Sequence, residues 1–391
     1  MKKKKNNFFY PLTKERLNTD DIKSGIKTLR SKNITMGKKT LEIENYFSKK
    51  IMKRDSLMVN SGSSANLLIF QALINPKINL LKKGDNILIP AVCWSTSLWP
   101  IIQSGLKPIF VDIDEKTLNI SVLDLKKKIN KQTKGLMLVH ALGNCAEMDE
   151  VVKICKEKKL ILIEDTCEAL GSKFKKKYLG TFGDFSSFSM YYSHHITSGE
   201  GGFVTSKLKK NINLLKVLRS HGWEKEVKKS TNNWRFINSG FNLRPTDINA
   251  SIGLSQLKRL KQILSIRNQN YNLLKKILYL SKKFKNQFEI ITSSKSKDVA
   301  WFGIAIILNK KFIKLKNNII IKLNKSGIET RPIISGNFAN QPAIKLYNIF
   351  PGKLINADKI EKSGFFLGLH NTILKKKELK KFEKFFFDAF I

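Results

Sequence analysis

Short apolar segments separated by helix-length stretches occupy the first two-thirds of the chain. Four of these segments have the length and composition of buried strands, and they cover residues 86–91, 108–112, 135–141 and 160–165. Strands that alternate with helices in this way form βαβ units. The pattern therefore predicts an α/β fold with a mainly parallel sheet, flanked by helices, that holds its ligands at the strand ends.

The hydrophobic pattern changes near Pro245. From there apolar residues recur at helical spacing and predict a long amphipathic helix that leads out of the first domain; they are Ile248, Ile252, Leu254, Leu257, Leu260 and Leu264. Strand-like residues 301–308 then indicate a smaller α/β portion. With 391 residues the chain is long enough for two cores. We expect a large domain over residues 1–262 and a small C-terminal domain over residues 263–391.

The composition is strongly basic, with a formal net charge of +41. The excess is nearly all lysine, is spread along the chain and accompanies abundant Asn and Ile. This composition is more typical of a protein from an A- and T-rich genome than of a polyanion-binding surface. We expect no nucleic-acid partner. No segment has membrane-spanning length and no long apolar run follows the N-terminal lysines, so we expect a cytoplasmic protein. The four cysteines stand singly, which predicts reduced thiols and no metal site.

Two segments of the first domain are suited to binding a charged small molecule. Residues 60–66 are mostly small, follow a strand-like segment and precede a helical pattern, so Gly62 and Ser63 can offer an anion cradle or simply a helix N-cap. The strand at residues 160–165 ends in Glu164 and Asp165. A buried carboxylate needs a cationic partner, and a protonated pyridine nitrogen would serve as well as a salt bridge.

The most informative stretch is residues 183–202, which reads as a strand through Ser189, then His194-His195, and then a Gly-Glu-Gly-Gly turn at residues 199–202. Together with Trp94, Asp165 and residues 240–247 and 331–338, this order resembles the DegT/DnrJ/EryC1/StrS sugar aminotransferase family nearly end to end. The resemblance implies the fold of the type I pyridoxal-phosphate enzymes. It also implies a set of residues that contact the cofactor: Gly62, Ser63, Trp94, Asp165, Glu168, Ser189 and Asn242.

One departure from the family changes the expected reaction. The family has a lysine six residues before the glutamate of this turn, and this chain has His194 there. Imidazole can carry a proton near neutral pH, but it cannot form a Schiff base with the cofactor. The resemblance then implies a 3-dehydratase, in which non-covalent pyridoxamine phosphate and His194 remove the C3 hydroxyl of a nucleotide-linked 4-keto-6-deoxyhexose. Glutamate would regenerate the pyridoxamine form from pyridoxal phosphate.

The resemblance also guides the expected substrate and assembly. Family members that act on CDP-linked sugars carry iron–sulfur cysteines after this motif, whereas no cysteine follows Cys167 here, which favours GDP-4-keto-6-deoxy-D-mannose. His221, Arg244 and Arg331 are the implied substrate contacts. Arg244 is a candidate for the glutamate carboxylate, with an interface salt bridge as its alternative. Asn242 would reach the neighbouring subunit's cofactor, which predicts a homodimer, and dideoxysugars of this kind point to O-antigen and lipopolysaccharide synthesis.

Three alternatives follow from the same residues. A CDP-sugar 3-dehydratase would share the chemistry. An aminotransferase would need another lysine, and Lys207 lies beyond the turn; borohydride fixation of the cofactor to a lysine would reveal it. A catalytically inactive protein would retain His194 as a structural residue and bind a nucleotide sugar or polyanion. Failure to bind the cofactor, with salt-sensitive polyanion binding, would favour that alternative.

Overall fold

The computed structural model describes residues 8–14, 16–228, 234–280, 286–293 and 296–391. Its main sheet has seven strands: β1 (Ser56–Val59), β2 (Asn86–Pro90), β3 (Lys107–Val111), β4 (Thr133–Val139), β5 (Ile161–Asp165), β8 (Phe185–Ser189) and β9 (Gly202–Ser206). They lie in the order β1-β9-β8-β5-β4-β2-β3, and β9 runs antiparallel to both of its neighbours while β2, β3, β4, β5 and β8 pair in parallel. The predicted α/β fold with a mainly parallel sheet is confirmed.

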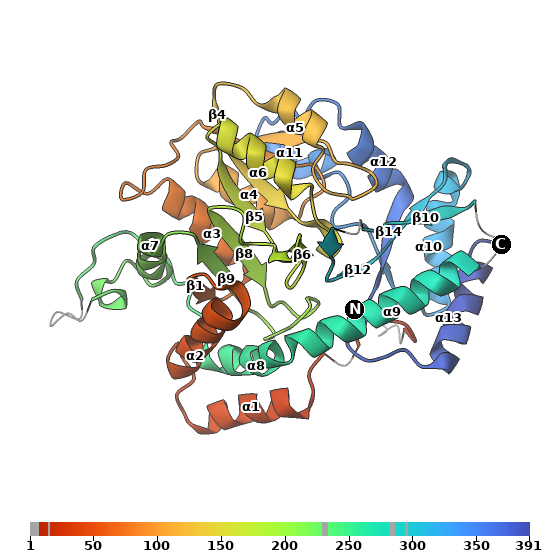
Figure 1. Ribbon diagram of the computed structural model, residues 1–391, viewed down its shortest axis with the longest axis horizontal. Helices are drawn as coiled ribbons and strands as arrows, with labels where there is room; N and C mark the ends of the chain where they lie inside the picture. Colours follow the sequence, from red (N-terminus) through yellow and green to blue (C-terminus); the bar gives the residue numbers. More distant parts are fainter. Residues whose placement is uncertain (1–7, 15, 229–233, 281–285, 294–295) are drawn as a thin grey trace.

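Helices cover both faces of this sheet (Figure 1). One face packs against α3 (Gly62–Leu73), α4 (Ser95–Gln103) and α7 (Lys209–Arg219), and the other packs against α5 (Val122–Lys128) and α6 (Met148–Glu157). Strand residues alternate between the two layers, so that Leu162 joins the α6 side and Ile163 the α3 side. Asp165, two residues after Ile163, therefore points toward α3.

A second helical layer lies beneath β8 and β9. It contains α1 (Thr19–Arg30), α2 (Lys38–Tyr46) and α8 (Asp247–Lys258), and α9 (Leu260–Leu280) continues from α8 toward the C-terminal part (Figure 1). The long helix expected after Pro245 is present as two successive helices, α8 and α9, which are interrupted only at Arg259. At the break the Arg259 amide donates to the Gln256 carbonyl at 2.9 Å, three residues back, which tightens the last turn of α8.

The C-terminal part contains an antiparallel sheet in the order β10-β12-β14-β13. Its strands are β10 (Phe288–Ile290), β12 (Gly303–Leu308), β13 (Thr330–Arg331) and β14 (Gly364–Gly368), and its helices are α10 (Lys316–Lys325), α11 (Pro342–Leu346), α12 (Ile355–Ser363) and α13 (Lys376–Asp388). A small sheet of β6 (Lys173–Phe174), β7 (Lys177–Tyr178) and β11 (Lys297–Asp298) joins this part to the first.

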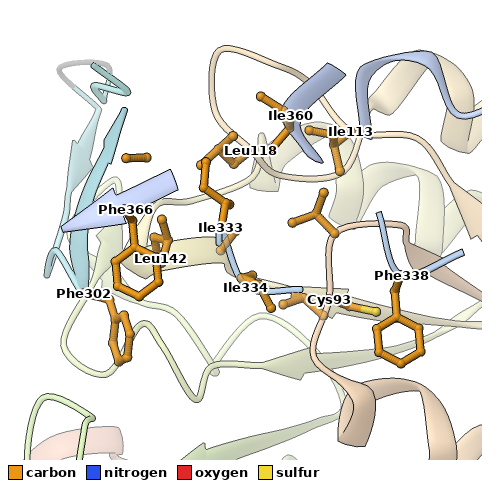
Figure 2. Close-up of a cluster of buried hydrophobic side chains, with 14 of the residues drawn as sticks. Cys93, Ile113, Leu118, Leu142, Phe302, Ile333, Ile334, Phe338, Ile360 and Phe366 are labelled. Atoms are coloured by element: carbon orange, nitrogen blue, oxygen red, sulfur yellow. The ribbon is translucent and has the colours of Figure 1, made fainter. Parts of the chain in front are cut away.

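The two parts also share one hydrophobic core. Figure 2 shows Cys93, Ile113, Leu118 and Leu142 from the N-terminal part in a cluster with side chains that follow residue 300, among them Phe302, Ile333 and Phe366. The division into domains at residue 262 stays a prediction. Within the ranges that the structure describes, no helix is both long and apolar enough to cross a lipid bilayer.

The N-terminal segment connects the C-terminal sheet to the main sheet. Tyr10 forms a parallel bridge with Ile328, and its hydroxyl donates to the Gly368 carbonyl at 2.8 Å. A few residues later the Arg16 Nε donates to the Tyr192 carbonyl at 2.9 Å, just after β8. The segment therefore carries Arg16 into the region that contains the candidate catalytic residues.

Candidate cofactor and catalytic site

The first turn of α3 lies directly against the end of β8. Ser61 caps the helix by accepting from the Ser64 amide at 3.0 Å, so Gly62 and Ser63 are in the first turn. A methyl group on Gly62 would lie 2.7 Å from the Ser189 Cβ and 3.0 Å from the Cys167 Sγ. Only glycine allows this close approach. It leaves the free N–H groups of a helix N-terminus beside the Ser189 hydroxyl, which is an arrangement that favours a phosphate.

Asp165 lies behind this cradle at the end of β5. The carboxylate is 5% exposed and accepts three hydrogen bonds, from Asn66 Nδ2 at 2.9 Å, Ser97 Oγ at 2.7 Å and the Cys167 amide at 3.1 Å. All three donors are neutral, and none of the ion pairs in the described ranges includes Asp165. A buried carboxylate whose charge is not balanced fits a ligand that brings a cation, such as a protonated ring nitrogen.

Trp94 stands at the start of α4, next to the same cradle. The Ser63 hydroxyl donates to Thr96 Oγ1 at 3.0 Å, and Asn66 Nδ2 donates to the Thr96 carbonyl at 3.1 Å, so the starts of α3 and α4 are tied together. The Trp94 side chain is 57% exposed. A large aromatic side chain left open at this point is suited to cover a planar ligand ring.

Glu168 follows Asp165 on the same connection. Its carboxylate accepts from the Leu142 amide at 2.8 Å, and Leu142 is in the left-handed region with φ of 49°. Burial, and then the negative charge of Asp165, raise the pKa of Glu168 to about 7. Glu168 therefore supports the backbone beside the cradle and can carry a proton near neutral pH.

His194 lies in the turn after β8, as the sequence predicts. Its ring packs edge-on against Phe302 at a centroid distance of 5.3 Å and against Tyr191 at 6.1 Å. The Nδ1 atom is buried without a hydrogen-bond partner in the described chain. Burial, and then the charges of Arg16 and Arg267, lower the pKa of His194 to about 3. The imidazole is therefore uncharged at neutral pH, which is the state a general base requires.

The neighbouring His195 differs from His194 in its surroundings. It is fully buried, and its Nε2 lies 2.9 Å from the Ala300 carbonyl. This bond connects the turn after β8 to the C-terminal part. The structure therefore gives His195 a supporting role, while His194 is available for chemistry.

Asn242, Arg244 and His221 form a separate cluster around Trp223. Arg244 Nε donates to Asn242 Oδ1 at 3.0 Å, its guanidinium lies 5.5 Å from the Trp223 ring centre, and the His221 ring lies 5.0 Å from the same ring. Asn242 is exposed. In the chain as described, no hydrogen bond or ring contact joins this cluster to Asp165 or His194.

Arg331 also lies apart from the cradle. It is in β13, its side chain is 59% exposed, and Nη2 pairs with Glu329 at 3.0 Å. Its strand neighbour Phe366 contacts Phe302 at 6.1 Å, and Phe302 contacts His194. Two aromatic residues, Phe366 and Phe302, therefore lie between the strand position of Arg331 and His194.

Sequence reasoning missed Arg16, Asn66 and Ser97. Asn66 and Ser97 hold the Asp165 carboxylate, and Arg16 is the charged neighbour of His194. A signal existed for Arg16, because an arginine among so many lysines is unusual in this chain.

The cysteines are free, and burial raises their thiol pKa values. Nowhere in the described ranges do three His, Cys, Asp or Glu side chains gather as a metal site would need.

The close contact at Gly62 leads to a prediction about cofactor binding. Gly62→Ala should displace the first turn of α3 by a few tenths of an ångström and weaken binding of pyridoxal phosphate about 10- to 100-fold, the value of a hydrogen bond to a charged group. Tryptophan fluorescence quenching measures the affinity. Gly25→Ala is the control, since its methyl meets only the flexible end of Ile252 at 3.2 Å. Unchanged affinity in Gly62→Ala would remove α3 from the site.

Three histidines with lowered pKa values should make the cofactor-free protein sensitive to acid. Burial lowers the pKa of His194 to about 3, that of His370 to about 4 and that of His195 well below 6.5, so each gains a proton on unfolding once the pH falls below 6.5. Glu168 opposes them, because its raised pKa makes it lose a proton on unfolding between pH 7 and 4.5. Stability therefore rises with pH through this window.

The net uptake is about two protons, so the free energy of unfolding should fall by at most about 2.7 kcal/mol per pH unit between about pH 6.5 and 5. Urea unfolding at several pH values measures this slope. His370→Gln should reduce the slope by about half, because one of the titrating groups is gone. Stability that does not change with pH across this window would contradict the assignment.

Comparison with known proteins agrees with this geometry. GDP-4-keto-6-deoxy-D-mannose 3-dehydratase of Escherichia coli O55:H7 is 36% identical over 93% of this chain and 96% of its own length. The solved E. coli GDP-4-keto-6-deoxy-D-mannose-3-dehydratase with bound hydrated PLP superposes with a TM-score of 0.91 at 34% identity, covering 97% of this chain and 99% of that one.

A second solved GDP-4-keto-6-deoxymannose-3-dehydratase holds a trapped PLP-glutamate geminal diamine. It superposes with a TM-score of 0.90 at 33% identity and covers 96% of this chain and all of that one (100%). The model of the DegT/DnrJ/EryC1/StrS aminotransferase family matches residues 15–381. The expected resemblance is confirmed, and the chain belongs to the DegT/DnrJ/EryC1/StrS aminotransferase family.

Proposed function

We propose that this protein is a pyridoxal-phosphate- and pyridoxamine-phosphate-dependent 3-dehydratase of GDP-4-keto-6-deoxy-D-mannose. The observation that carries the proposal is His194, an uncharged imidazole where the family pattern has the cofactor-binding lysine, beside a site whose other cofactor groups are present. The reaction exchanges the C3 hydroxyl for hydrogen while glutamate becomes 2-oxoglutarate and ammonia. The two-electron reduction of the sugar at C3 is therefore balanced by the two-electron oxidation of glutamate.

The residues around Asp165 fit the cofactor. Gly62, Ser63 and Ser189 would bind its phosphate, Trp94 would cover its ring, and the unbalanced charge of Asp165 would keep the ring nitrogen protonated. When bound, the cofactor supplies an amine for the C4 ketone and a ring that accepts electrons. Glu168 would hold the Leu142 backbone beside that ring. No lysine side chain is needed to hold the cofactor covalently.

His194 performs both proton transfers in this proposal. One imidazole nitrogen accepts a proton as a base, and the imidazolium that forms donates this proton to the departing C3 hydroxyl of the sugar. The low pKa favours prompt return of the proton. The edge-on contact with Phe302 would keep the ring in place between the two steps.

The cluster around Trp223 would act in an assembly of two chains. Asn242 is exposed, and Arg244 orients its amide oxygen, so we propose that Asn242 reaches the cofactor phosphate of a partner subunit in a homodimer. Arg244, His221 and Arg331 are proposed contacts for the anionic groups of glutamate and the nucleotide sugar. We further propose that the protein acts in the cytoplasm, in dideoxysugar synthesis for an O-antigen lipopolysaccharide.

Ammonia release tests this function against its alternatives. The protein is mixed with pyridoxal phosphate, glutamate and either GDP-4-keto-6-deoxymannose or its CDP-linked analogue, and ammonia is measured with a coupled dehydrogenase. We expect ammonia in proportion to the GDP-sugar consumed. Consumption of glutamate and sugar without ammonia would indicate an aminotransferase, and ammonia with the CDP-sugar alone would reassign the nucleotide. Consumption of neither sugar would favour a binding protein.

A further inference from the structure

Arg16 is a buried arginine whose outer nitrogens have no partner. The residue is 3% exposed, and its Nε donates to the Tyr192 carbonyl at 2.9 Å. Gln256 holds the Arg16 carbonyl at 2.6 Å and also accepts from the Thr197 amide at 2.8 Å. Yet both Nη1 and Nη2 are buried without an acceptor in the described part of the chain. The backbone and the inner nitrogen are thus held in place, and the outer fork is unsatisfied.

Arg267 shows what the fold does with a structural arginine. It is 1% exposed, and its three nitrogens donate to three backbone carbonyls and one amide oxygen: those of Trp301, Phe302, Leu369 and Asn371. Buried charged donors almost always have such acceptors. The same fold that satisfies Arg267 fully leaves Arg16 with free N–H groups, so Arg16 is suited to an acceptor that arrives with a ligand.

Arg16 lies next to the candidate catalytic histidine. Arg16 holds Tyr192, two residues before His194, and is close enough for its charge to lower the pKa of His194. None of the ion pairs in the described ranges includes Arg16. An anion bound here would balance this charge next to the residue that moves protons.

We propose that the Arg16 guanidinium binds a carboxylate of the amino donor, glutamate; this inference rests on the proposed function. A planar carboxylate matches the two free nitrogens of the fork. The α-carboxylate is attached to the carbon that must react beside His194, whereas the diphosphate of a nucleotide sugar is attached at C1, away from C3 and C4. Because glutamate has two carboxylates, Arg244 remains a candidate for the second.

Calorimetric titration of the pyridoxal-phosphate-loaded protein tests this inference, with glutarate as an unreactive dicarboxylate and GDP as the diphosphate probe. Arg16→Gln should weaken glutarate binding about 10- to 100-fold and leave GDP binding within about twofold. The glutarate affinity of Arg16→Lys should lie between those of wild type and Arg16→Gln, since lysine keeps the charge but loses the two-nitrogen fork. Arg30→Gln is the matched control, because Arg30 is exposed in the last turn of α1 and should bind both probes like wild type.

Several results would overturn the inference. Unchanged glutarate affinity in Arg16→Gln would exclude the carboxylate role, and selective loss of GDP binding would assign the fork to the diphosphate. If Arg16→Gln does not fold, Arg16→Lys provides the test. A glutarate affinity of Arg16→Lys equal to that of wild type would then exclude the carboxylate role of Arg16. Glutarate binding needs no turnover, so the two claims can fail separately. If the wild-type protein releases no ammonia but Arg16→Gln still loses glutarate affinity, the dehydratase function is contradicted and the carboxylate role of Arg16 is not. Steady-state kinetics should show a raised KM for glutamate with an unchanged KM for the sugar.

Discussion

Replacement of His194 by asparagine is expected to slow removal of the C3 hydroxyl by about 10²- to 10⁴-fold, the usual contribution of a general acid–base group. Asparagine has nearly the size of histidine and forms hydrogen bonds, but it cannot accept and return a proton at neutral pH. Cofactor affinity should stay close to wild type, because the cofactor contacts come from Asp165, Ser189 and the first turn of α3. Single-turnover product formation and the visible spectrum of the bound cofactor measure the two quantities.

Replacement of His194 by lysine gives the converse result. Lysine restores the amine that the family pattern has at this position, so borohydride should fix pyridoxal phosphate to the variant and leave the wild-type chain unlabelled. Dehydration should be slow, because the cofactor is then held through the side chain that should move the proton. A fully active dehydratase with lysine or asparagine at this position would rule out the proposed role of His194.

Asp165→Asn is expected to lower turnover about 100-fold, since the loss of a hydrogen bond to a charged group costs about 1.5–3 kcal/mol. The reason is electrostatic. Asp165 accepts only from neutral donors in the described chain, and its charge is therefore available to keep the ring nitrogen of the cofactor protonated. The unfolding midpoint should change little, because the substitution removes a buried charge that has no cationic partner.

Glu164→Gln is the matched control for Asp165→Asn. Glu164 is the adjacent acid on β5 but points to the opposite face, where it accepts from the amides of Gly180, Phe182 and Gly183 and lies 3.2 Å from His140 Nε2. Burial alone would raise the pKa of Glu164, but His140 and the amides of Gly183 and Gly180 lower it below its usual value. Glu164→Gln should lower the unfolding midpoint and keep turnover near wild type. If instead Glu164→Gln abolishes turnover and Asp165→Asn does not, the two acids have been assigned to the wrong faces.

The sequence predicted the central sheet because its strands are buried on both faces and carry near-continuous apolar residues. The strand expected at residues 160–165 is β5 (Ile161–Asp165), and the strand-like segment expected just before residue 60 is β1 (Ser56–Val59). Alternation along a strand also explains why Asp165 and Glu164 face different partners. Local pattern therefore sufficed for the parallel strands β2 to β5 and for the position of Asp165, whereas the antiparallel strand β9 was not expected.

The hydrophobic pattern of the sequence could not predict contacts between distant segments. Arg16 reaches Tyr192 across 176 residues, and the Asp165 partners Asn66 and Ser97 come from two different helices. Nothing in the local sequence around these residues indicates that the helices converge there. The break at Arg259 was missed for another reason, because an apolar repeat that continues through residues 248–264 does not reveal a one-residue interruption of the helix.

The most direct test of the central claim is the mass of the sugar nucleotide formed from GDP-4-keto-6-deoxymannose by the wild-type protein with pyridoxal phosphate and glutamate. The proposed dehydratase gives a product lighter by one oxygen, which forms only when glutamate is present. A product in which the carbonyl oxygen has been exchanged for an amine, with the C3 hydroxyl retained, would contradict it.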